Sequence, residues 1–265
     1  MAILNVTPDS FYSGSRTPDA EAVERRVREV VEEGASIIDV GGYSSRPGAD
    51  PISEEEEWRR VELGVAAVRR LAPDLPVSVD TFRSGVAERA LERFGPLAVN
   101  DISAGELDPR MPAVAARYEV PYIAMHMKGD PQTMQSLTDY GHGIVSEVVS
   151  YFARRVAELQ EAGIRRENII LDPGFGFAKT LEQNYELLAG LHELRASGYP
   201  VLAGLSRKSM IYKALDATPA ESLAGTIALG WECLRQGASI LRVHDVREAV
   251  DTVRLFGHFQ RNGIR

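Results

Sequence analysis

Short apolar segments recur along the chain, and each of them runs into a polar or charged residue at its C-terminal end. There are eight, at residues 3–7, 37–42, 77–80, 97–101, 123–126, 169–172, 201–206 and 240–244. The stretches between them carry apolar residues at the spacing of a helix face, as at Val23, Val27 and Val30. Strands that alternate with helices along a whole chain predict an α/β fold, and eight such units predict a closed (β/α)8 barrel, the TIM barrel. Because the active site of such a barrel lies at the C-terminal ends of its strands, the polar ends predict one functional basin.

The length and the helix start signals agree with this architecture. The 265 residues are close to the roughly 250 of one barrel, and no linker interrupts the alternation, so a single domain is predicted over residues 1–265. Ser53 followed by Glu56 resembles a capping box, which predicts that a helix begins just after Ser53. Thr218 and Pro219 predict in the same way that a later helix begins at Pro219.

Composition and charge narrow the classes of function. A net charge of −8 argues against a general nucleic-acid surface, which depends on a broad excess of Lys and Arg. No apolar run approaches the roughly 20 residues of a membrane span, and the N-terminus lacks the layout of a secretory signal, so the cytoplasm is the expected compartment. Cys233 is the only cysteine, which excludes an intrachain disulfide and a cysteine-based metal site. Positive charge nevertheless gathers at strand ends, which predicts an anionic substrate there. The residues are Arg46, Arg207, Lys208, Arg242 and His244.

Three strand ends carry groups that suit a polar heterocycle. Asp80 and Asp172 each terminate an apolar segment, and a carboxylate there can accept two parallel hydrogen bonds from an amidine-like edge. Asn100 adds a donor and an acceptor, and Lys208 comes from a later strand end. Taken singly, each Asp or Asn is better explained as a cap of the following helix, but the group together favours a heterocycle pocket.

Two loops after strands have compositions that suit ligand binding. Residues 41–48 combine glycines, serines, an arginine and a proline, which suits an oxyanion, although a solvated surface turn explains them about equally well. Residues 172–177 carry Phe175 and Phe177, which can pack on a flat substrate or plug the top of the barrel. The Gly-x-Gly of this segment lacks the strand, turn and helix context of a dinucleotide site, so no dinucleotide is predicted.

The last two strand ends favour a phosphate site. Residues 206–209 precede a predicted short helix at 210–215, whose free N–H groups would attract a carboxylate or a phosphate. Arg242 and His244 lie on the same side of the last strand, because side chains alternate along a strand. This arrangement favours an anion site over a basic pair that merely balances acids such as Asp245.

A set of short motifs follows one another along the chain. They are Asn5-Val6-Thr7-Pro8-Asp9-Ser10-Phe11, Ser45-Arg46-Pro47-Gly48, Ser78-Val79-Asp80, Asn100-Asp101-Ile102, Met125-His126-Met127, Asp172-Pro173-Gly174-Phe175-Gly176-Phe177, Ser206-Arg207-Lys208-Ser209 and Arg242-Val243-His244. In this order they resemble the dihydropteroate synthase family of the folate pathway, and the similarity spans essentially the whole chain. Members of that family condense hydroxymethyl-dihydropterin pyrophosphate with p-aminobenzoate, which forms dihydropteroate and releases pyrophosphate. Sulfonamides compete for the aminobenzoate site.

The resemblance implies a role for each motif. The pterin ring would be held by Asp80, Asn100, Met125, Asp172 and Lys208. The pyrophosphate would be held by Asn5, Ser45, Arg46, Arg242 and His244, with Mg²⁺ contacted through Asn5. The p-aminobenzoate would lie against Arg46, Pro47, Phe177, Lys208 and Ser209. The residues expected to act in catalysis are Asp80, Asp172, Lys208, Arg242 and His244.

The chain departs from the family pattern in a few places. Ser13 stands where members commonly have an Asp linked to the metal, and Ser45 stands where Thr is more usual. Members usually have further residues before the first strand, so a chain that starts at Met1 is expected to be less stable. Two other functions stay open, a pterin-binding methyltransferase that acts with a corrinoid protein and a non-catalytic pterin-binding relative. The resemblance also implies a homodimer, and the apolar face of residues 223–234 is its expected interface.

Overall fold

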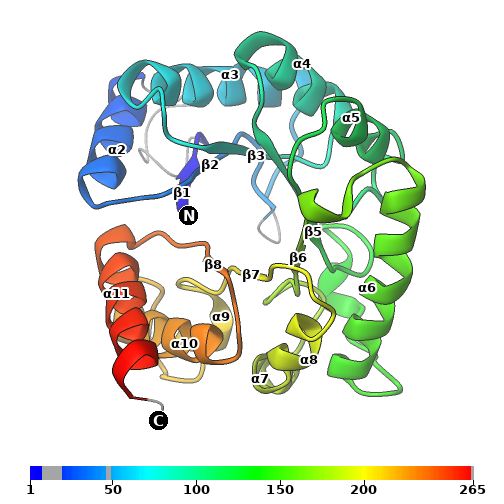
Figure 1. The fold of residues 1–265 in the computed structure, drawn as a ribbon, viewed down its shortest axis with the longest axis vertical. Coiled ribbons are helices and arrows are strands. Elements are labelled where there is room, and N and C mark those ends of the chain that lie inside the picture. The colour runs from blue at the N-terminus through cyan, green and yellow to red at the C-terminus, as the bar shows by residue number, and fades with distance from the viewer. Residues whose placement is uncertain (8–19, 46–48, 264–265) are drawn as a thin grey trace.

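Eight parallel strands form the centre of the molecule and helices surround them in the computed structural model, which describes residues 1–7, 20–45 and 49–263 (Figure 1). The strands are β1 (Ala2–Asn5), β2 (Ile38–Gly41), β3 (Val77–Asp80), β4 (Ala98–Asp101), β5 (Tyr122–Met125), β6 (Ile169–Asp172), β7 (Leu202–Ala203) and β8 (Ile240–Leu241). Strands β1 to β6 pair in chain order, and β7 pairs with β8. Parallel bridges from Leu171 to Val201 and from Ala2 to Val243 join the two sheets, so the ring of strands is closed. The predicted TIM barrel is confirmed.

Helices form the outer layer. They are α2 (Ala20–Glu32), α3 (Glu54–Leu71), α4 (Ser84–Phe94), α5 (Met111–Arg117), α6 (Ile144–Glu161), α7 (Leu181–Ala189), α8 (Leu191–Arg195), α9 (Ser209–Tyr212), α10 (Leu223–Arg235) and α11 (Val246–Asn262). Among the helices of the described ranges, none has the length and apolar character needed to cross a membrane.

The two predicted helix starts have different outcomes. Ser53 caps α3 as predicted, because its Oγ accepts a hydrogen bond from Glu56 N at 3.2 Å. The prediction that a late helix begins at Pro219 is wrong, since α10 begins at Leu223. The carbonyls of Pro219 and the next residue each accept a hydrogen bond from Arg207 Nη1 at 2.8 Å, which holds this segment as a turn.

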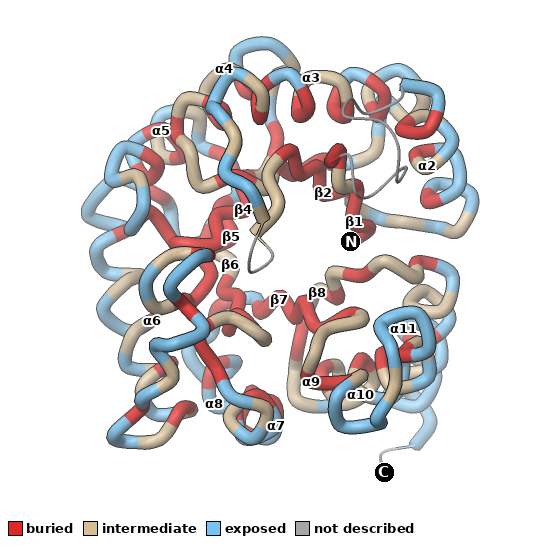
Figure 2. Tube along the Cα trace, turned by 180° about the vertical axis from the view of Figure 1, so that it is seen from behind, coloured by how far each residue is buried: buried red, intermediate tan, exposed pale blue. Residues whose placement is uncertain are grey.

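Along each strand, one residue faces the helices and the next faces the interior of the barrel. Val6 and Val40 face α3, where Gly64 allows a close approach: a Cβ on Gly64 would lie 2.5 Å from Val40 Cγ1 and 2.9 Å from Val6 Cγ2. Asp39 and Gly41, on either side of Val40, therefore face the barrel interior. The strands and the inner helix faces are buried, while the outer helix faces are exposed (Figure 2). The apolar core thus lies between strands and helices, and the barrel interior is open to polar groups.

The register of the strands brings polar positions into one row. Asn5 pairs with Gly41, Gly41 pairs with Asp80, and Asp80 pairs with Asn100 across four neighbouring strands. Each of these residues lies at the C-terminal end of its strand or one position before it. One layer of the barrel therefore presents an amide, a gap, a carboxylate and a second amide side by side.

Candidate active site

An arginine ties three strands together at the floor of this basin. Arg242 directly follows β8, and its Nε donates to Asp39 Oδ2 at 2.6 Å while its Nη2 donates to Asp80 Oδ2 at 2.6 Å. Asp39 is fully buried and also accepts hydrogen bonds from Asn100 Nδ2 at 3.0 Å and from the Ser78 hydroxyl. Both oxygens of Asp39 therefore have donors, as a buried carboxylate requires. One guanidinium faces two carboxylates, which leaves excess negative charge in the floor.

Three groups of the basin have perturbed pKa values. Burial raises the pKa of Asp80, Arg242 opposes this and the Asp39 carboxylate adds to it, and the resulting pKa is about 7. Burial also raises the pKa of Asp172, while Lys208 lowers it. Burial lowers the pKa of Lys208 to about 8, against the effect of Asp172. Two carboxyl groups with raised pKa values and an amine with a lowered pKa in one basin are typical of a functional site.

Asn5 ends β1 and faces Asp80, which ends β3, across Gly41 of β2. A Cβ on Gly41, which stands between them in the sheet, would be 3.3 Å from Asn5 Oδ1 and 3.5 Å from Asp80 Cβ. Because Gly41 has no side chain, the space between the amide and the carboxylate stays open. Among the described residues, no three His, Cys, Asp or Glu side chains are grouped as a metal site. A hard cation beside Asn5 would therefore take one protein oxygen and fill its shell with water and ligand oxygens.

The loop after β6 is held through its backbone. Asp172 Oδ1 accepts a hydrogen bond from Gly174 N at 2.8 Å. Gly174 has a φ of 70°, and a Cβ there would collide with His126 O, so this turn requires glycine. Lys179 is buried below the loop, and its Nζ donates to Gly174 O at 2.9 Å and to Phe177 O at 2.8 Å and lies 3.1 Å from His126 Nδ1. The loop backbone is fixed from inside the protein.

Lys208 and Phe177 form one wall of the basin. Lys208 Nζ donates to Phe175 O at 2.6 Å and lies 4.6 Å from the centre of the Phe177 ring. Phe177 packs on a small apolar cluster. The cluster contains Ile102, Met125, Met127, Met134 and Ala178. Met125 ends β5 and pairs with Asp172 in the sheet, so apolar surface meets a carboxylate and an ammonium at this point. Such a surface suits a flat ring with polar edges.

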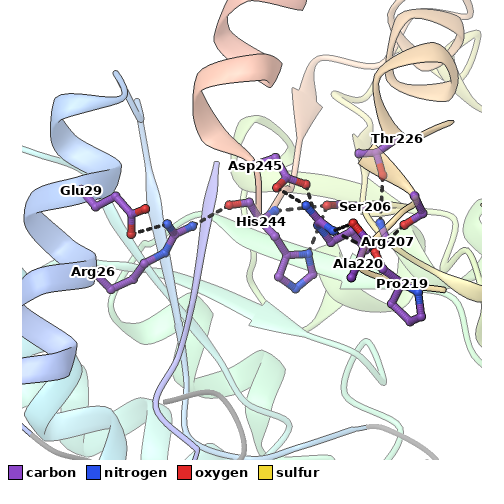
Figure 3. Close-up of polar contacts among 10 residues, drawn as sticks. Arg26, Glu29, Ser206, Arg207, Pro219, Ala220, Thr226, His244 and Asp245 are labelled. Atoms are coloured by element: carbon purple, nitrogen blue, oxygen red, sulfur yellow. Dashed lines mark hydrogen bonds and ion pairs between the residues drawn. The ribbon is translucent and has the colours of Figure 1, made fainter. Parts of the chain in front are cut away.

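Hydrogen bonds and an ion pair connect the loop after β7 to the loop after β8 (Figure 3). Ser206 Oγ accepts a hydrogen bond from His244 N at 3.2 Å and lies 3.1 Å from His244 Nδ1. The next residue, Arg207, binds both carboxylate oxygens of Asp245, at 2.7 and 2.8 Å. The prediction that Arg207 adds to the anion-binding charge is wrong, because Asp245 and two backbone carbonyls take its guanidinium. Asp245 is therefore paired with Arg207, whereas Arg242 balances two other acids, Asp39 and Asp80.

The structure brings most of the predicted site residues to the C-terminal ends of the strands. These are Asn5, Asp80, Asn100, Met125, Asp172, Phe177, Lys208, Arg242 and His244. Ser45 is half-buried at the end of a described segment. Ser209 opens α9, which is Ser209–Tyr212 rather than the predicted 210–215. Arg46, Pro47 and Ser13 lie outside the described residues.

Asp39 is the residue that sequence reasoning missed. It stands inside β2, whereas the residues predicted to form the site stand at or after strand ends. Its signal was a lone carboxylate within an otherwise apolar strand, because such a group can be buried only with partners. The partners come from β3, from β4 and from the residue after β8, which no local pattern reveals.

Known proteins resemble the chain along most of its length. The profile that describes pterin binding enzymes matches residues 1–244. The chain is 46% identical over 247 residues to the dihydropteroate synthase of Synechocystis sp. (strain ATCC 27184 / PCC 6803 / Kazusa), an alignment that covers 93% of this chain and 84% of that protein. The structure of Xanthomonas albilineans dihydropteroate synthase with 4-aminobenzoic acid matches with a TM-score of 0.89 and 38% identity, over 98% of this chain and 92% of that chain. The structure of dihydropteroate synthase from Anaplasma phagocytophilum with bound 6-hydroxymethylpterin-monophosphate has a TM-score of 0.87 and 35% identity, over 97% of each chain.

Proposed function

This chain belongs to the pterin-binding enzyme family, and we propose that it acts as a dihydropteroate synthase. The reaction joins 6-hydroxymethyl-7,8-dihydropterin pyrophosphate to p-aminobenzoate and yields 7,8-dihydropteroate and pyrophosphate, so the enzyme is a transferase. The observation that carries the proposal is the group of Asp80, Asn100, Asp172 and Lys208 in one basin, with Arg242 joined to Asp80. Hydrogen-bonding groups for a heterocycle and cations for a phosphate are both present.

The pterin ring would bind at the carboxylate side of the basin. Asp80 and Asp172 would accept hydrogen bonds from the ring N–H and amino groups, and Asn100 would supply both a donor and an acceptor. Met125 and the stem of Lys208 would lie against the ring. Arg242 keeps Asp80 in place at 2.6 Å, so the recognition surface is organised before the substrate arrives.

The pyrophosphate would bind where cations and amide groups converge. Its ligands would be Asn5, Ser45, Arg46, Arg242 and His244. The oxygen chemistry beside Asn5 suits Mg²⁺, which prefers oxygen ligands and commonly keeps substrate phosphates and water in its shell. When bound, Mg²⁺ would neutralise negative charge on the departing pyrophosphate.

The p-aminobenzoate would lie against the side chains of Phe177 and Lys208. The Phe177 ring already lies 4.6 Å from Lys208 Nζ, which offers one apolar face and one positive charge to an aromatic carboxylate. Arg46, Pro47 and Ser209 would complete this subsite. The amine of p-aminobenzoate would then face the methylene carbon of the pterin.

The reaction would proceed by early loss of pyrophosphate. The C–O bond to pyrophosphate breaks first, and the electron pair leaves with the oxygen. The methylene cation that remains is conjugated with the electron-rich pterin, and the carboxylates of Asp80 and Asp172 would stabilise its charge. The aryl amine nitrogen then forms the C–N bond and loses a proton. Arg242 and His244 would stabilise the growing charge of the leaving group, and no covalent enzyme intermediate is needed.

The protein would act as a homodimer of single-domain subunits. Residues 1–265 are taken as one domain because strands from both ends of the described chain close one barrel. Apolar side chains are exposed on α10 and α11, which pack side by side (Figure 1). These are Ile227, Val253, Leu255 and Phe259. A surface of this kind is typical of a subunit interface. A cytoplasmic location also belongs to this proposal, supported by the single, buried Cys233.

The test is a coupled measurement of both products. The purified protein is mixed with dihydropterin pyrophosphate, p-aminobenzoate and Mg²⁺, and pyrophosphate and dihydropteroate are quantified with each substrate omitted in turn. Equal amounts of both products, dependent on both substrates, are expected. Asp172→Asn should reduce turnover strongly while pterin binding remains measurable, because its charge matters most when the cation forms. Wild-type turnover in Asp172→Asn would contradict the role given to this carboxylate.

Other outcomes would favour the competing functions. Binding of the pterin without release of pyrophosphate would identify a non-catalytic relative. Methyl transfer to a corrinoid protein would identify the methyltransferase, which has no need of the cationic pair Arg242 and His244.

A further inference from the structure

Ser206 is buried, and both partners of its hydroxyl belong to His244. Ser206 Oγ accepts a hydrogen bond from the backbone N–H of His244 at 3.2 Å and lies 3.1 Å from the ring nitrogen Nδ1 (Figure 3). A serine hydroxyl has one proton to donate and two lone pairs that can accept. The backbone N–H uses one lone pair, so the position of the hydroxyl proton decides how the ring is bound.

The burial of Ser206 decides where that proton points. Within residues 1–7, 20–45 and 49–263, the Nδ1 of His244 is the only acceptor in hydrogen-bond reach of Ser206 Oγ. If Nδ1 carried a proton, the buried hydroxyl would have no acceptor for its own proton among these described residues, and buried donors are almost always paired. We propose that Ser206 is a positioning residue that donates to His244 Nδ1 and so fixes His244 as the neutral tautomer with its proton on Nε2.

The loops hold both partners at this distance. Arg26 Nη2 donates to His244 O at 2.5 Å, which ties the segment after β8 to α2. The ion pair of Arg207 with Asp245 links the residues that directly follow Ser206 and His244 (Figure 3). These contacts hold the backbones of Ser206 and His244 side by side, which keeps the hydroxyl within reach of the ring.

The inference rests on the proposed function and deepens it. An imidazole with its proton on Nε2 is a hydrogen-bond donor while it remains neutral, so His244 can donate to an oxygen of the departing pyrophosphate without first gaining a proton. The opposite tautomer would present a lone pair to the anion and repel it. Ser206 thus gives His244 the polarity that the leaving group needs, although Ser206 itself touches no reacting atom.

The first test reads the tautomer directly and needs no activity. The protein is labelled with ¹⁵N at its five histidines, and the ring nitrogens are recorded at about pH 8.5, roughly two units above an ordinary imidazole pKa. His244→Gln identifies the His244 signals by their loss. Wild type and Ser206→Thr should have a protonated Nε2 and an unprotonated Nδ1, whereas Ser206→Ala should exchange between both tautomers. The other histidine signals, unchanged, establish that each variant is folded. A protonated Nδ1 in the wild type, or identical spectra in Ser206→Ala and wild type, would overturn the proposal.

The second test measures binding of inorganic pyrophosphate with Mg²⁺ by calorimetry. Glutamine can place an N–H donor near the position of Nε2, whereas the shorter asparagine cannot, so His244→Asn should weaken binding roughly tenfold more than His244→Gln. Ser206→Ala should weaken binding by about five- to tenfold, and Ser206→Thr by less than about twofold. Equal losses in His244→Gln and His244→Asn would overturn the donor role of Nε2. If the wild type turns over substrate but His244 has its proton on Nδ1, only this inference is refuted. If the wild type binds no pyrophosphate, the proposed function and the donor role of Nε2 are refuted, and the spectrum still decides the tautomer.

Discussion

Replacing Asp39 with Asn removes a buried negative charge while it keeps the shape of the side chain. The Asn oxygen can still accept from Arg242 and Asn100, and its amide nitrogen can donate to the Ser78 hydroxyl, which can accept as well as donate. Asp39→Ala, in contrast, removes the acceptor of Asn100 Nδ2, of the Ser78 hydroxyl and of Arg242 Nε, while Arg242 Nη2 keeps Asp80. We therefore expect Asp39→Asn to lower the free energy of unfolding by about 1–2 kcal/mol and Asp39→Ala to lower it by roughly 3–5 kcal/mol.

The functional effect of Asp39→Asn acts through Asp80. Both carboxylates contact the guanidinium of Arg242, so they lie on the order of 6 Å apart, and like charges at that separation repel by roughly 3 kcal/mol at an effective dielectric constant of about 20. Without the charge of Asp39, the pKa of Asp80 should fall from about 7. The fall should be between about one and two units, since one unit corresponds to roughly 1.4 kcal/mol. Asp80 would then keep its charge in more acidic solution.

The assay is the pH profile of kcat/KM for dihydropterin pyrophosphate between about pH 5 and 9. In the wild type, activity should rise through about pH 7 as Asp80 loses its proton, and in Asp39→Asn this acid limb should move to lower pH. Glu62→Gln serves as the control, because it removes the same charge from a side chain of α3 that pairs with Arg93 on the outside of the barrel. An acid limb that stays in place or moves to higher pH in Asp39→Asn would refute the electrostatic coupling between Asp39 and Asp80.

Three further predictions follow from the site and the core. The profile of kcat/KM should fall above about pH 8 because Lys208 loses its proton there, and Lys208→Arg should remove this alkaline limb, since arginine stays charged; a limb that persists in Lys208→Arg would assign it to another group. Lys179→Met should lower the free energy of unfolding, measured in denaturant, by roughly 2–4 kcal/mol and raise the KM for p-aminobenzoate, because Gly174 O and Phe177 O lose their buried donor. An unchanged stability and KM would mean that the loop after β6 keeps its conformation without Lys179. Gly64→Ala should lower the free energy of unfolding by about 1–3 kcal/mol, because its Cβ would press on Val40 and Val6. Gly257→Ala on α11 is the control: the nearest atom to its Cβ lies 3.6 Å away, so it should stabilise the protein by up to about 1 kcal/mol. Similar effects of both substitutions would contradict the close packing of α3.

Local periodicity was enough to predict the barrel. Each strand was readable because its apolar residues must be buried between helices and barrel interior, and each polar end was readable because strand ends meet solvent. The strand-end carboxylates Asp80 and Asp172 were predicted for this reason, and the structure brings them into one basin. The helix start at Pro219 was predicted from the same kind of signal and is wrong, because a distant guanidinium takes the carbonyls that a helix would have used.

Pairing between distant residues could not be predicted from the sequence. Arg242 and Asp39 are 203 positions apart, and only the closure of the barrel brings them to 2.6 Å. Arg207 looked like a free cation for an anionic substrate, and its contact with Asp245 removed it from that role. The contact between Ser206 and His244 likewise depends on two loops that meet only because β7 lies beside β8.

Local sequence patterns are sufficient to place the strands and most helices, the apolar faces that they bury and the chemical groups that stand at the strand ends. These properties are local, because they follow from the alternation of side chains and from the transfer of apolar groups out of water. The tertiary structure alone decided which charges neutralise one another, which carboxylate titrates near neutral pH and which hydroxyl orients a ring. Those properties depend on distances of a few ångströms between segments far apart in the chain, and electrostatic and hydrogen-bond energies change steeply over such distances.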